Sequence, residues 1–477
     1  MKAPGSGSRR KRIGILCLSA IPDDPRVRRQ GDLMTEAGWD VVAIGLPGHR
    51  SSDPEWTCLA IDTVQSTPTV AADEVPNAND LSNPAVGESF SISGETTALA
   101  GRKATSKSKT PRQLLTARLA QRLDEYGVPT WANPVLLPII VTLMPAVRRL
   151  YSAWRALRVN LQPSYAAASY WRLRDDFQRI YELGRRHEVD LWLANDWTTL
   201  PIAARLGAAQ GVPYGYDTHE LAVDEYAQSL KWRFLNRALI KGAEGSAIKG
   251  AAFVTCVSDG IADRLKEVYE LDTRPVVIRN TPHYQRYSPK PVGETIRVLY
   301  HGIVAPGRGL EAAIRSVPLW RPEFHLTIRG PAHADYKAAL EKIARERNVS
   351  DRVTLDPPVP MTDLVARAAE FDVGLFALPD HSKQNVYVLP NKFFEYTMAG
   401  LALCVSDLPE MTRLLRAHNL GVLIEAMSPE AIASAVNQLN RDNLTRYKAR
   451  ALEAAKVLNW QIEGSRFIKL SDRAIRS

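Results

Sequence analysis

The sequence predicts an α/β protein made of two doubly wound parallel-sheet domains in tandem. Short apolar runs alternate with helical segments almost throughout the 477 residues, a pattern typical of parallel sheets with helices on both faces. One Pro-rich, polar stretch without periodic pattern, "TPHYQRYSPKPVGET", interrupts the alternation and is interpreted as the linker. The chain is long enough for each domain to bury a core of its own.

The first domain is predicted to cover residues 1–285. Asp24 and Pro25 are typical of the N-cap and first position of a helix. Residues 65–110 are rich in Ser, Thr, Pro, Asn and Gly, and we expect a disordered insertion, because so little apolar surface does not offset the entropy lost on ordering. The strands are expected at "RIGILCLSA", "WDVVAIG", "WTCLAIDTV", "VDLWLAND", "VPYGYDTHE", "AAFVTCVS" and "RPVVIRN".

Residues 111–188 are predicted to form a basic, partly apolar helical insertion. Residues 101–186 hold sixteen Lys and Arg against five Asp and Glu, and the whole chain has a net charge of +9. The segment "NPVLLPIIVTLMPAV" is apolar, but too short and too interrupted by Pro to span a bilayer. Two interpretations stay open: peripheral contact with an anionic membrane, or a buried helical hairpin with a solvated basic face. Nucleic acid is not expected as a partner, because aromatic residues do not interleave with the charges.

The cysteines and the N-terminus favour a cytoplasmic location. The four cysteines show no metal-ligand or paired spacing, and three lie in apolar runs where buried free thiols are common, which indicates a reducing compartment. The N-terminal "GSRRKRIGILCLSAIP" resembles a signal peptide, but the helix and second strand that follow favour the first strand of a domain.

The second domain is predicted to cover residues 296–458, and a C-terminal helix, residues 459–477, is expected to pack back on the first domain. Ligands of open parallel sheets bind at the carboxyl ends of the strands, so the cleft between the domains is the expected site. The strands are expected at "IRVLYHG", "FHLTIRG", "RVTLDPP", "FDVGLFAL", "LALCVSD" and "LGVLIE".

One motif of the second domain, "VLYHGIVAPGRGLEAAI", is a candidate anion site. A strand leads through Gly302 to a helix that begins near Gly309, an arrangement that points backbone N–H groups at an anion. A cation such as Arg308 at the start of a helix interacts unfavourably with the helix dipole, unless an anion shares the site and offsets that repulsion. The alternative is a solvated Arg on a loop.

A second motif, "VLPNKFFEYTMAG", adds a Lys and a Glu. Asn391 and Lys392 fall in the first turn of a helix, where Lys392 again suits a phosphate. Glu395 shares a face with Lys392, and a buried carboxylate there would be satisfied by two vicinal ribose hydroxyls. The alternative is a surface Lys–Glu pair worth only about 0.3–0.5 kcal/mol.

Polar residues also lie at the ends of two strands of the first domain. His219 and Glu220 follow one strand and Asp196 another, where they would face a ligand or, alternatively, cap a loop. The sequence has no HExxH, no Cys/His cluster with ligand spacing, no nucleophile elbow and no Walker A motif. No metal is therefore expected.

Together these motifs resemble those of GT-B glycosyltransferases, close to glycosyltransferase family 4 of the retaining, group 1 type. The resemblance covers nearly the whole chain outside about residues 65–186 and is strongest in "LPNKFFEYTMAGLALCVSDLPEM". It implies two Rossmann-like domains that close over a nucleotide-diphosphate sugar, retention without a metal, and no cofactor beyond this donor substrate. It rests also on "DPRVRR...AGWDV", "ANDW...GYDTHE", "VSDGIADRL...VIRN" and "LYHGIVAPGRGLE".

The resemblance also implies a role for each candidate residue. Glu395 matches the glutamate that holds the ribose, Arg308 and Lys392 match the cations that grip the diphosphate, and His219 matches a histidine near the reacting sugar. These four are the expected catalytic set. The remaining donor-side residues are Gly302, Gly309 and Asn391, and the acceptor-side residues are Asp24, Arg26, Asp196 and Glu220.

Three positions depart from the family pattern. Tyr387 stands where many members carry a second glutamate, and Ile303 follows Gly302 where "GR" is usual. The loop at residues 14–26, which would approach the acceptor and the donor, lacks the usual Gly-Gly. These departures leave the donor sugar open.

The leading interpretation is a glycosyltransferase that adds a sugar to a lipid-linked or surface-polysaccharide precursor, a glycan or glycolipid acceptor. The basic, apolar insertion motivates the lipid part. Two alternatives stay open: a soluble small-molecule acceptor, or a catalytically silent partner that only binds nucleotide-sugar.

Overall fold

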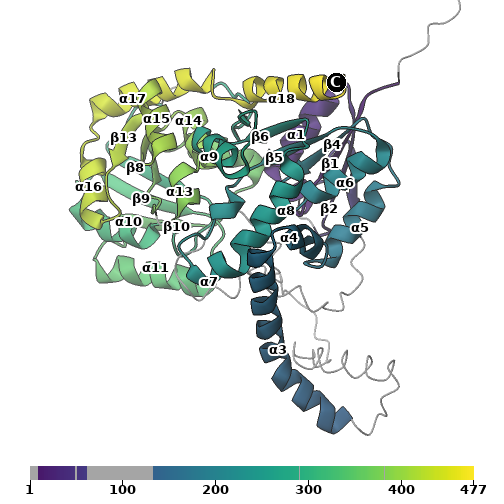
Figure 1. Cartoon of the computed structure of the whole chain (residues 1–477). Coiled ribbons are helices and arrows are strands. Elements are labelled where there is room, and N and C mark those ends of the chain that lie inside the picture. The colour runs from purple at the N-terminus through teal and green to yellow at the C-terminus, as the bar shows by residue number, and fades with distance from the viewer. Residues whose placement is uncertain (1–8, 49–50, 62–132, 289, 381, 477) are drawn as a thin grey trace, which may run out of the picture.

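The computed structural model describes residues 9–48, 51–61, 133–288, 290–380 and 382–476. They form two parallel sheets, one in each half of the molecule, with helices on both faces of each sheet (Figure 1). The predictions for residues 65–110 and 111–132 lie outside the described residues.

The first sheet has seven strands, and its central strands are buried on both faces. Gly14 leaves no room for a side chain, since a Cβ there would lie 2.3 Å from the Trp192 ring. The elements are β1 (Arg12–Leu16), α1 (Pro25–Glu36), β2 (Asp40–Gly45), β3 (Thr57–Ala60), β4 (Leu191–Asn195), α6 (Leu200–Gln210), β5 (Tyr214–Thr218), β6 (Phe253–Cys256), α9 (Asp259–Tyr269) and β7 (Val276–Val277).

The second sheet has six strands around a separate apolar core. Its strands and the helices that connect them are β8 (Ile296–His301), α10 (Leu310–Ser316), β9 (Phe324–Arg329), α11 (Ala334–Glu346), β10 (Val353–Asp356), α12 (Leu364–Ala368), β11 (Val373–Phe376), α13 (Lys383–Tyr387), α14 (Asn391–Ala399), β12 (Ala402–Ser406), α15 (Pro409–His418), β13 (Gly421–Ile424), α16 (Pro429–Asn437) and α17 (Arg441–Ala455).

Both sheets have the topology of a doubly wound fold. The strand order is β3-β2-β1-β4-β5-β6-β7 in the first sheet and β10-β9-β8-β11-β12-β13 in the second. Each order reverses once, beside β1 and beside β8, and ligands of such sheets bind where the order reverses. The predicted pair of doubly wound parallel-sheet domains is confirmed.

Helices fill the chain between residue 133 and β4. They are α3 (Asn133–Leu161), α4 (Ser164–Tyr170) and α5 (Asp175–Gly184). Proline was expected to interrupt the apolar segment at the start of this region, but α3 is one helix of 29 residues. Its first turns extend away from the rest of the described chain (Figure 1). Among the described residues, no helix combines the length and apolar character needed to cross a bilayer.

The helical segment between β5 and β6 contains a change of helical type. It begins as α7 (Leu230–Trp232), passes through a π-helical turn, η4 (Arg233–Arg237), and continues as α8 (Ala238–Ile248). A short 3-10 turn, η3 (Ala222–Asp224), precedes it after β5. The η4 turn packs against α3.

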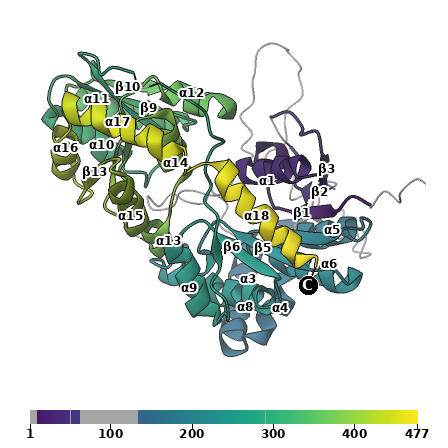
Figure 2. The same cartoon turned by 90° about the horizontal axis from the view of Figure 1, so that it is seen from above.

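The last helix, α18 (Trp460–Ala474), returns to the first sheet and crosses from one half of the molecule to the other (Figure 2). Its first residue, Trp460, is 1% exposed, and the indole N–H donates to the carbonyl oxygen of Arg29 at 3.2 Å. Phe467 meets Phe253 edge-on, with ring centres 6.1 Å apart. The α18 helix therefore joins the core of the first domain.

We expect Trp460→Ala to lower the free energy of unfolding by about 3–5 kcal/mol, because it removes a fully buried ring from the junction of α1 and α18. Val457→Ala is the matched control, since Val457 lies three residues earlier and is 50% exposed. Urea unfolding of both variants measures the difference. An equal effect of the two substitutions would contradict the role given to Trp460.

Candidate active site

Two glycines shape the loop that follows β8. Gly302 has φ +123° and Gly309 has φ +72°, conformations that residues with side chains rarely adopt. A Cβ on Gly309 would lie 2.1 Å from the carbonyl oxygen of Ala377, just past β11. The predicted donor-side glycines thus place bare backbone at the carboxyl ends of two neighbouring strands.

Arg308 and Lys392 are buried beside this loop. Arg308 is 2% exposed and Lys392 is 5% exposed, and a Cβ on Gly302 would lie 3.3 Å from Lys392 Nζ. Burial lowers the pKa of Arg308 to about 9. Burial and the charge of Arg308 lower the pKa of Lys392 well below its usual value. Two neighbouring buried cations favour an anionic ligand, because it would offset their repulsion and lost hydration.

Glu395 completes this group from the same helix as Lys392. Its Oε2 lies 2.9 Å from Nε2 of His301, whose ring stacks on Tyr396 with centres 4.7 Å apart. Burial opposes ionisation, but His301, Arg29 and Lys392 together lower the pKa of Glu395. It is therefore a carboxylate that accepts hydrogen bonds. Sequence reasoning missed His301, although its position at the end of a parallel strand could have identified it.

In the first domain, Asp217 is the centre of a buried polar network. It is 0% exposed, and Arg26 binds it with two hydrogen bonds, from Nε at 2.8 Å and from Nη2 at 2.7 Å. Gln30 and Thr255 also donate to its carboxylate. Burial opposes ionisation, but Arg26 and His219 hold the pKa of Asp217 well below its usual range.

The expected place of Arg26 on the acceptor side needs correction. Arg26 is 2% exposed, and its remaining Nη1 donates to the carbonyl oxygen of Ile278 at 3.0 Å. The side chain turns into the domain because a buried Asp217 requires a cation, and the residue type alone does not reveal that requirement. Arg26 positions Asp217 instead of facing a ligand.

His219 sits between two carboxylates. Its Nε2 lies 3.1 Å from Oδ2 of Asp217, and its Nδ1 lies 3.7 Å from Oδ2 of Asp196. Burial lowers the pKa of His219, but the two carboxylates outweigh burial and raise it. Asp196 has a left-handed backbone, φ +65°, which for a non-glycine residue is uncommon and is found at active sites. The geometry favours an imidazolium that donates hydrogen bonds.

The other two predicted acceptor-side residues have different environments. Asp24 caps α1 by accepting from the backbone N–H of Arg26 and Val27 at 3.0 and 3.1 Å, a structural role that its sequence position already indicated. Burial and the charge of Glu225 raise the pKa of Glu220 well above its usual value. Glu220 therefore favours the protonated form.

The two groups of residues lie close together across the domain boundary. Arg29, on α1, is near enough to Glu395 for each charge to shift the pKa of the other. The backbone N–H of Leu221 donates to Oε1 of Gln384, on α13, at 2.7 Å. Sequence reasoning missed Arg29, because helical periodicity does not show which face meets a second domain. Within the described ranges, no three His, Cys, Asp or Glu side chains are arranged to hold a metal ion.

Comparison with protein families decides the class. The profile described as "Glycosyl transferases group 1" matches residues 295–442, and "Glycosyltransferase Family 4" matches residues 137–281. The chain belongs to the GT-B glycosyltransferases of group 1 and family 4. The resemblance stated from the motifs is confirmed.

Solved structures share the fold of this glycosyltransferase at low sequence identity. Sucrose-phosphate synthase from Thermosynechococcus elongatus is 13% identical with a TM-score of 0.62, over 97% of this chain and 99% of that one. Anabaena HepE in complex with UDP and glucose is 12% identical with a TM-score of 0.58, over 97% and 100%. A glycosyltransferase from Rickettsia africae is 9% identical with a TM-score of 0.57, over 98% and 99%. None of the curated protein sequences matches the chain significantly.

Tyr387 stands where the family pattern has a second glutamate, and it lies at the contact between the domains. Its carbonyl oxygen accepts a hydrogen bond from Ser258 Oγ at 2.7 Å. Its ring covers Gly260, where a Cβ would lie 2.3 Å from a ring carbon. In this glycosyltransferase the position contributes packing between the domains in place of a carboxylate.

The raised pKa of His219 predicts a pH-dependent contribution to stability. A histidine whose pKa is higher in the folded state than in the unfolded state stabilises the protein. This contribution is complete below the unfolded-state pKa, about 6.5, and is lost as the pH rises through the folded-state pKa. We expect His219→Gln to lower the free energy of unfolding most at pH 5 to 6. Urea unfolding of the variant and the wild type over a range of pH measures this effect. His418→Gln is the control, because burial lowers the pKa of His418. A pH-independent effect of His219→Gln would contradict the assigned charge.

Proposed function

We propose that this glycosyltransferase is a retaining enzyme that moves a sugar from a nucleotide-diphosphate sugar to a lipid-linked or surface-polysaccharide precursor. The observation that carries the donor part is the buried pair of cations, Arg308 and Lys392, next to the ionised Glu395. The cations suit a diphosphate, and the carboxylate suits two ribose hydroxyls.

The proposed chemistry follows from where charge develops. As the sugar–phosphate bond breaks, the sugar becomes oxocarbenium-like and the diphosphate gains negative charge. Arg308 and Lys392 stabilise that charge from fixed positions, which is the most effective form of electrostatic catalysis. The acceptor oxygen bonds to the anomeric carbon from the face that the phosphate leaves, and its proton passes to the departing phosphate, so the configuration is retained and no metal is needed.

His219 has an orienting role in this proposal. Both of its ring nitrogens face carboxylates, so the imidazolium is a poor general base. Asp217 fixes the ring by binding Nε2 at 3.1 Å. The other nitrogen, Nδ1, lies 3.7 Å from Asp196, beyond hydrogen-bond distance, so Nδ1–H is the group that donates to the reacting sugar.

Uridine is the first candidate for the nucleotide. HepE has been solved with UDP-glucose, and the pneumococcal transferase GtfA with UDP and GlcNAc. These proteins are 14% and 16% identical to this chain. The likeness therefore serves to choose UDP-sugars as the first ligands to test.

The lipid-linked acceptor is supported by α3, which exposes large apolar side chains. A glycolipid acceptor would place the enzyme at the inner face of the cytoplasmic membrane as a peripheral protein. Tyr387 favours one alternative, a partner that binds nucleotide-sugar without transferring it, because the carboxylate expected at that position is missing.

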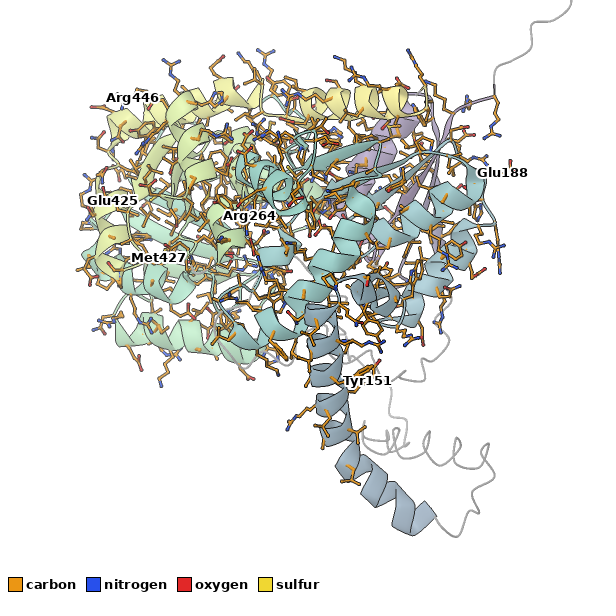
Figure 3. The ribbon with its side chains drawn as sticks, in the orientation of Figure 1. Tyr151, Glu188, Arg264, Glu425, Met427 and Arg446 are labelled. Atoms are coloured by element: carbon orange, nitrogen blue, oxygen red, sulfur yellow. The ribbon has the colours of Figure 1, made fainter. Side chains whose placement is uncertain are left out.

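We expect Glu395→Ala and Arg308→Ala each to lower the rate of sugar transfer about 100- to 1000-fold, because each removes a fixed charge from the donor site. Glu425→Ala and Arg446→Ala are matched controls. Both residues are exposed and lie at the far edge of the second domain (Figure 3). Radiolabelled sugar transfer from the donor measures the rates. Full activity of either site variant, with an unchanged unfolding transition, would rule out the assignment.

A thermal-shift panel of UDP-, GDP- and ADP-sugars tests the nucleotide. A ligand at about 100 times its Kd stabilises the folded state by about 2.7 kcal/mol, so UDP-sugars should raise the Tm most. Lys392→Ala should remove the shift. A larger shift with GDP- or ADP-sugars would contradict the choice of uridine, and no shift with any of them would contradict the donor site.

A further inference from the structure

The described chain concentrates its exposed apolar side chains on two neighbouring segments. Thirteen large apolar side chains are exposed, and eight of them lie on α3 or on the α7–η4 segment. The six on α3 are Leu143, Val147, Leu150, Trp154, Leu157 and Leu161.

These six residues form one face of α3. Their spacing alternates between four and three residues, which places them on one side of a helix. Leu150 is 71% exposed and Leu161 is 72% exposed. The opposite side packs on the first domain, where Ser152, Arg155 and Val159 are buried. Among the described residues, α3 is therefore packed on one face and uncovered on the other.

The α7–η4 segment extends the same surface. Leu230 is 76% exposed and Phe234 is 46% exposed. Asn160, near the end of α3, donates from Nδ2 to the carbonyl oxygen of Phe234 at 3.1 Å, so the two segments touch. We call the exposed residues of α3 and α7–η4 the basal surface.

The charges of the basal surface have one sign. The α3 helix contains four Arg and no acidic residue, and residues 230–237, "LKWRFLNR", contain no acidic residue either. Arg149, Arg158, Lys231 and Arg233 are exposed beside the apolar side chains. Trp154 and Tyr151 add aromatic rings that favour the headgroup region of a bilayer.

We propose that the basal surface lies on an anionic membrane, with α3 entering the boundary between headgroups and acyl chains. Apolar side chains flanked by arginine fit that boundary, because the apolar atoms leave water while the cations meet lipid phosphates. The first half of α3, residues 134–147, contains fourteen residues and no charge. At 1.5 Å per residue it is about 21 Å long, which suits shallow insertion.

A second copy of the chain fits the basal surface less well. Two such surfaces facing each other would bring arginines together with no acidic partner on either helix, and like charges disfavour that contact. Figures 1 and 3 show α3 extending from the body of the protein, and Figure 3 marks Tyr151 where the helix leaves it. That shape lets a flat lipid surface reach the helix.

The basal surface is connected to the active site through the loop after β5. Asp224, in η3, is 2% exposed and accepts hydrogen bonds from Arg237 of η4 and from Arg264 of α9. Leu221, three residues earlier, meets the second domain at Gln384. The loop between His219 and η4 therefore runs from the active site to the membrane. This inference extends the proposed lipid-linked acceptor by identifying where the lipid surface would meet the enzyme.

Flotation of the full chain with vesicles tests the proposal. The protein should float with vesicles of phosphatidylcholine and phosphatidylglycerol, and much less with phosphatidylcholine alone. Leu150→Glu/Leu161→Glu should lower the bound fraction roughly tenfold, because it places charge on the apolar face. Arg149→Glu/Lys231→Glu should lower it at low salt, where charge attraction is strongest.

Leu319→Glu/Val457→Glu is the matched control, since both residues are 50% exposed and lie outside the basal surface. It should float like the wild type. A wild type that does not float, or an unchanged Leu150→Glu/Leu161→Glu variant, would overturn the proposal. So would sedimentation that shows a dimer converted to a monomer by this variant, because α3 would then be an interface between copies. Flotation needs no catalysis, so a protein that floats but transfers no sugar would contradict only the proposed function.

Discussion

The buried carboxylate of Asp217 is the constraint around which the first domain arranges its part of the site. A carboxylate without exposure requires cations and hydrogen-bond donors. Arg26 and Gln30 supply them from α1, and Thr255 supplies one from β6. The same carboxylate binds His219, so the interaction that docks α1 onto the sheet also fixes the orientation and charge of the residue nearest the reacting sugar in our proposal.

In the second domain the buried charges at the site are positive instead of negative. This domain buries two cations, Arg308 and Lys392, at the ends of β8 and β11, where their mutual repulsion is unfavourable. Glu395 and the rings of Tyr300 and Phe376 lie around Lys392. Such a site favours an anionic ligand, because an anion would offset the repulsion and the lost hydration of the two side chains. Burial of apolar side chains in the large core of that domain offsets the free energy lost by burying the two charges.

The C-terminal helix is one of the elements that connect the two halves. Trp460 is the first residue of α18, where the chain returns to the first domain. Its ring lies beside the guanidinium groups of Arg26 and Arg29. Arg26 belongs to the Asp217 network, and Arg29 influences Glu395 across the domain boundary. The path of the C-terminal helix therefore supports both sides of the site at once.

The sequence by itself determined the two parallel sheets, the helix that Asp24 caps, the loop around Gly302 and Gly309, and the helix that carries Lys392 and Glu395. These features depend on local periodicity, capping and glycine conformation, which neighbouring residues control. The tertiary structure decided the roles of Arg26, Arg29 and His301, because the partner of a buried charge comes from a distant strand or from the other domain. It also decided that the described residues leave the apolar face of α3 uncovered, since composition describes a helix without showing which of its faces is packed.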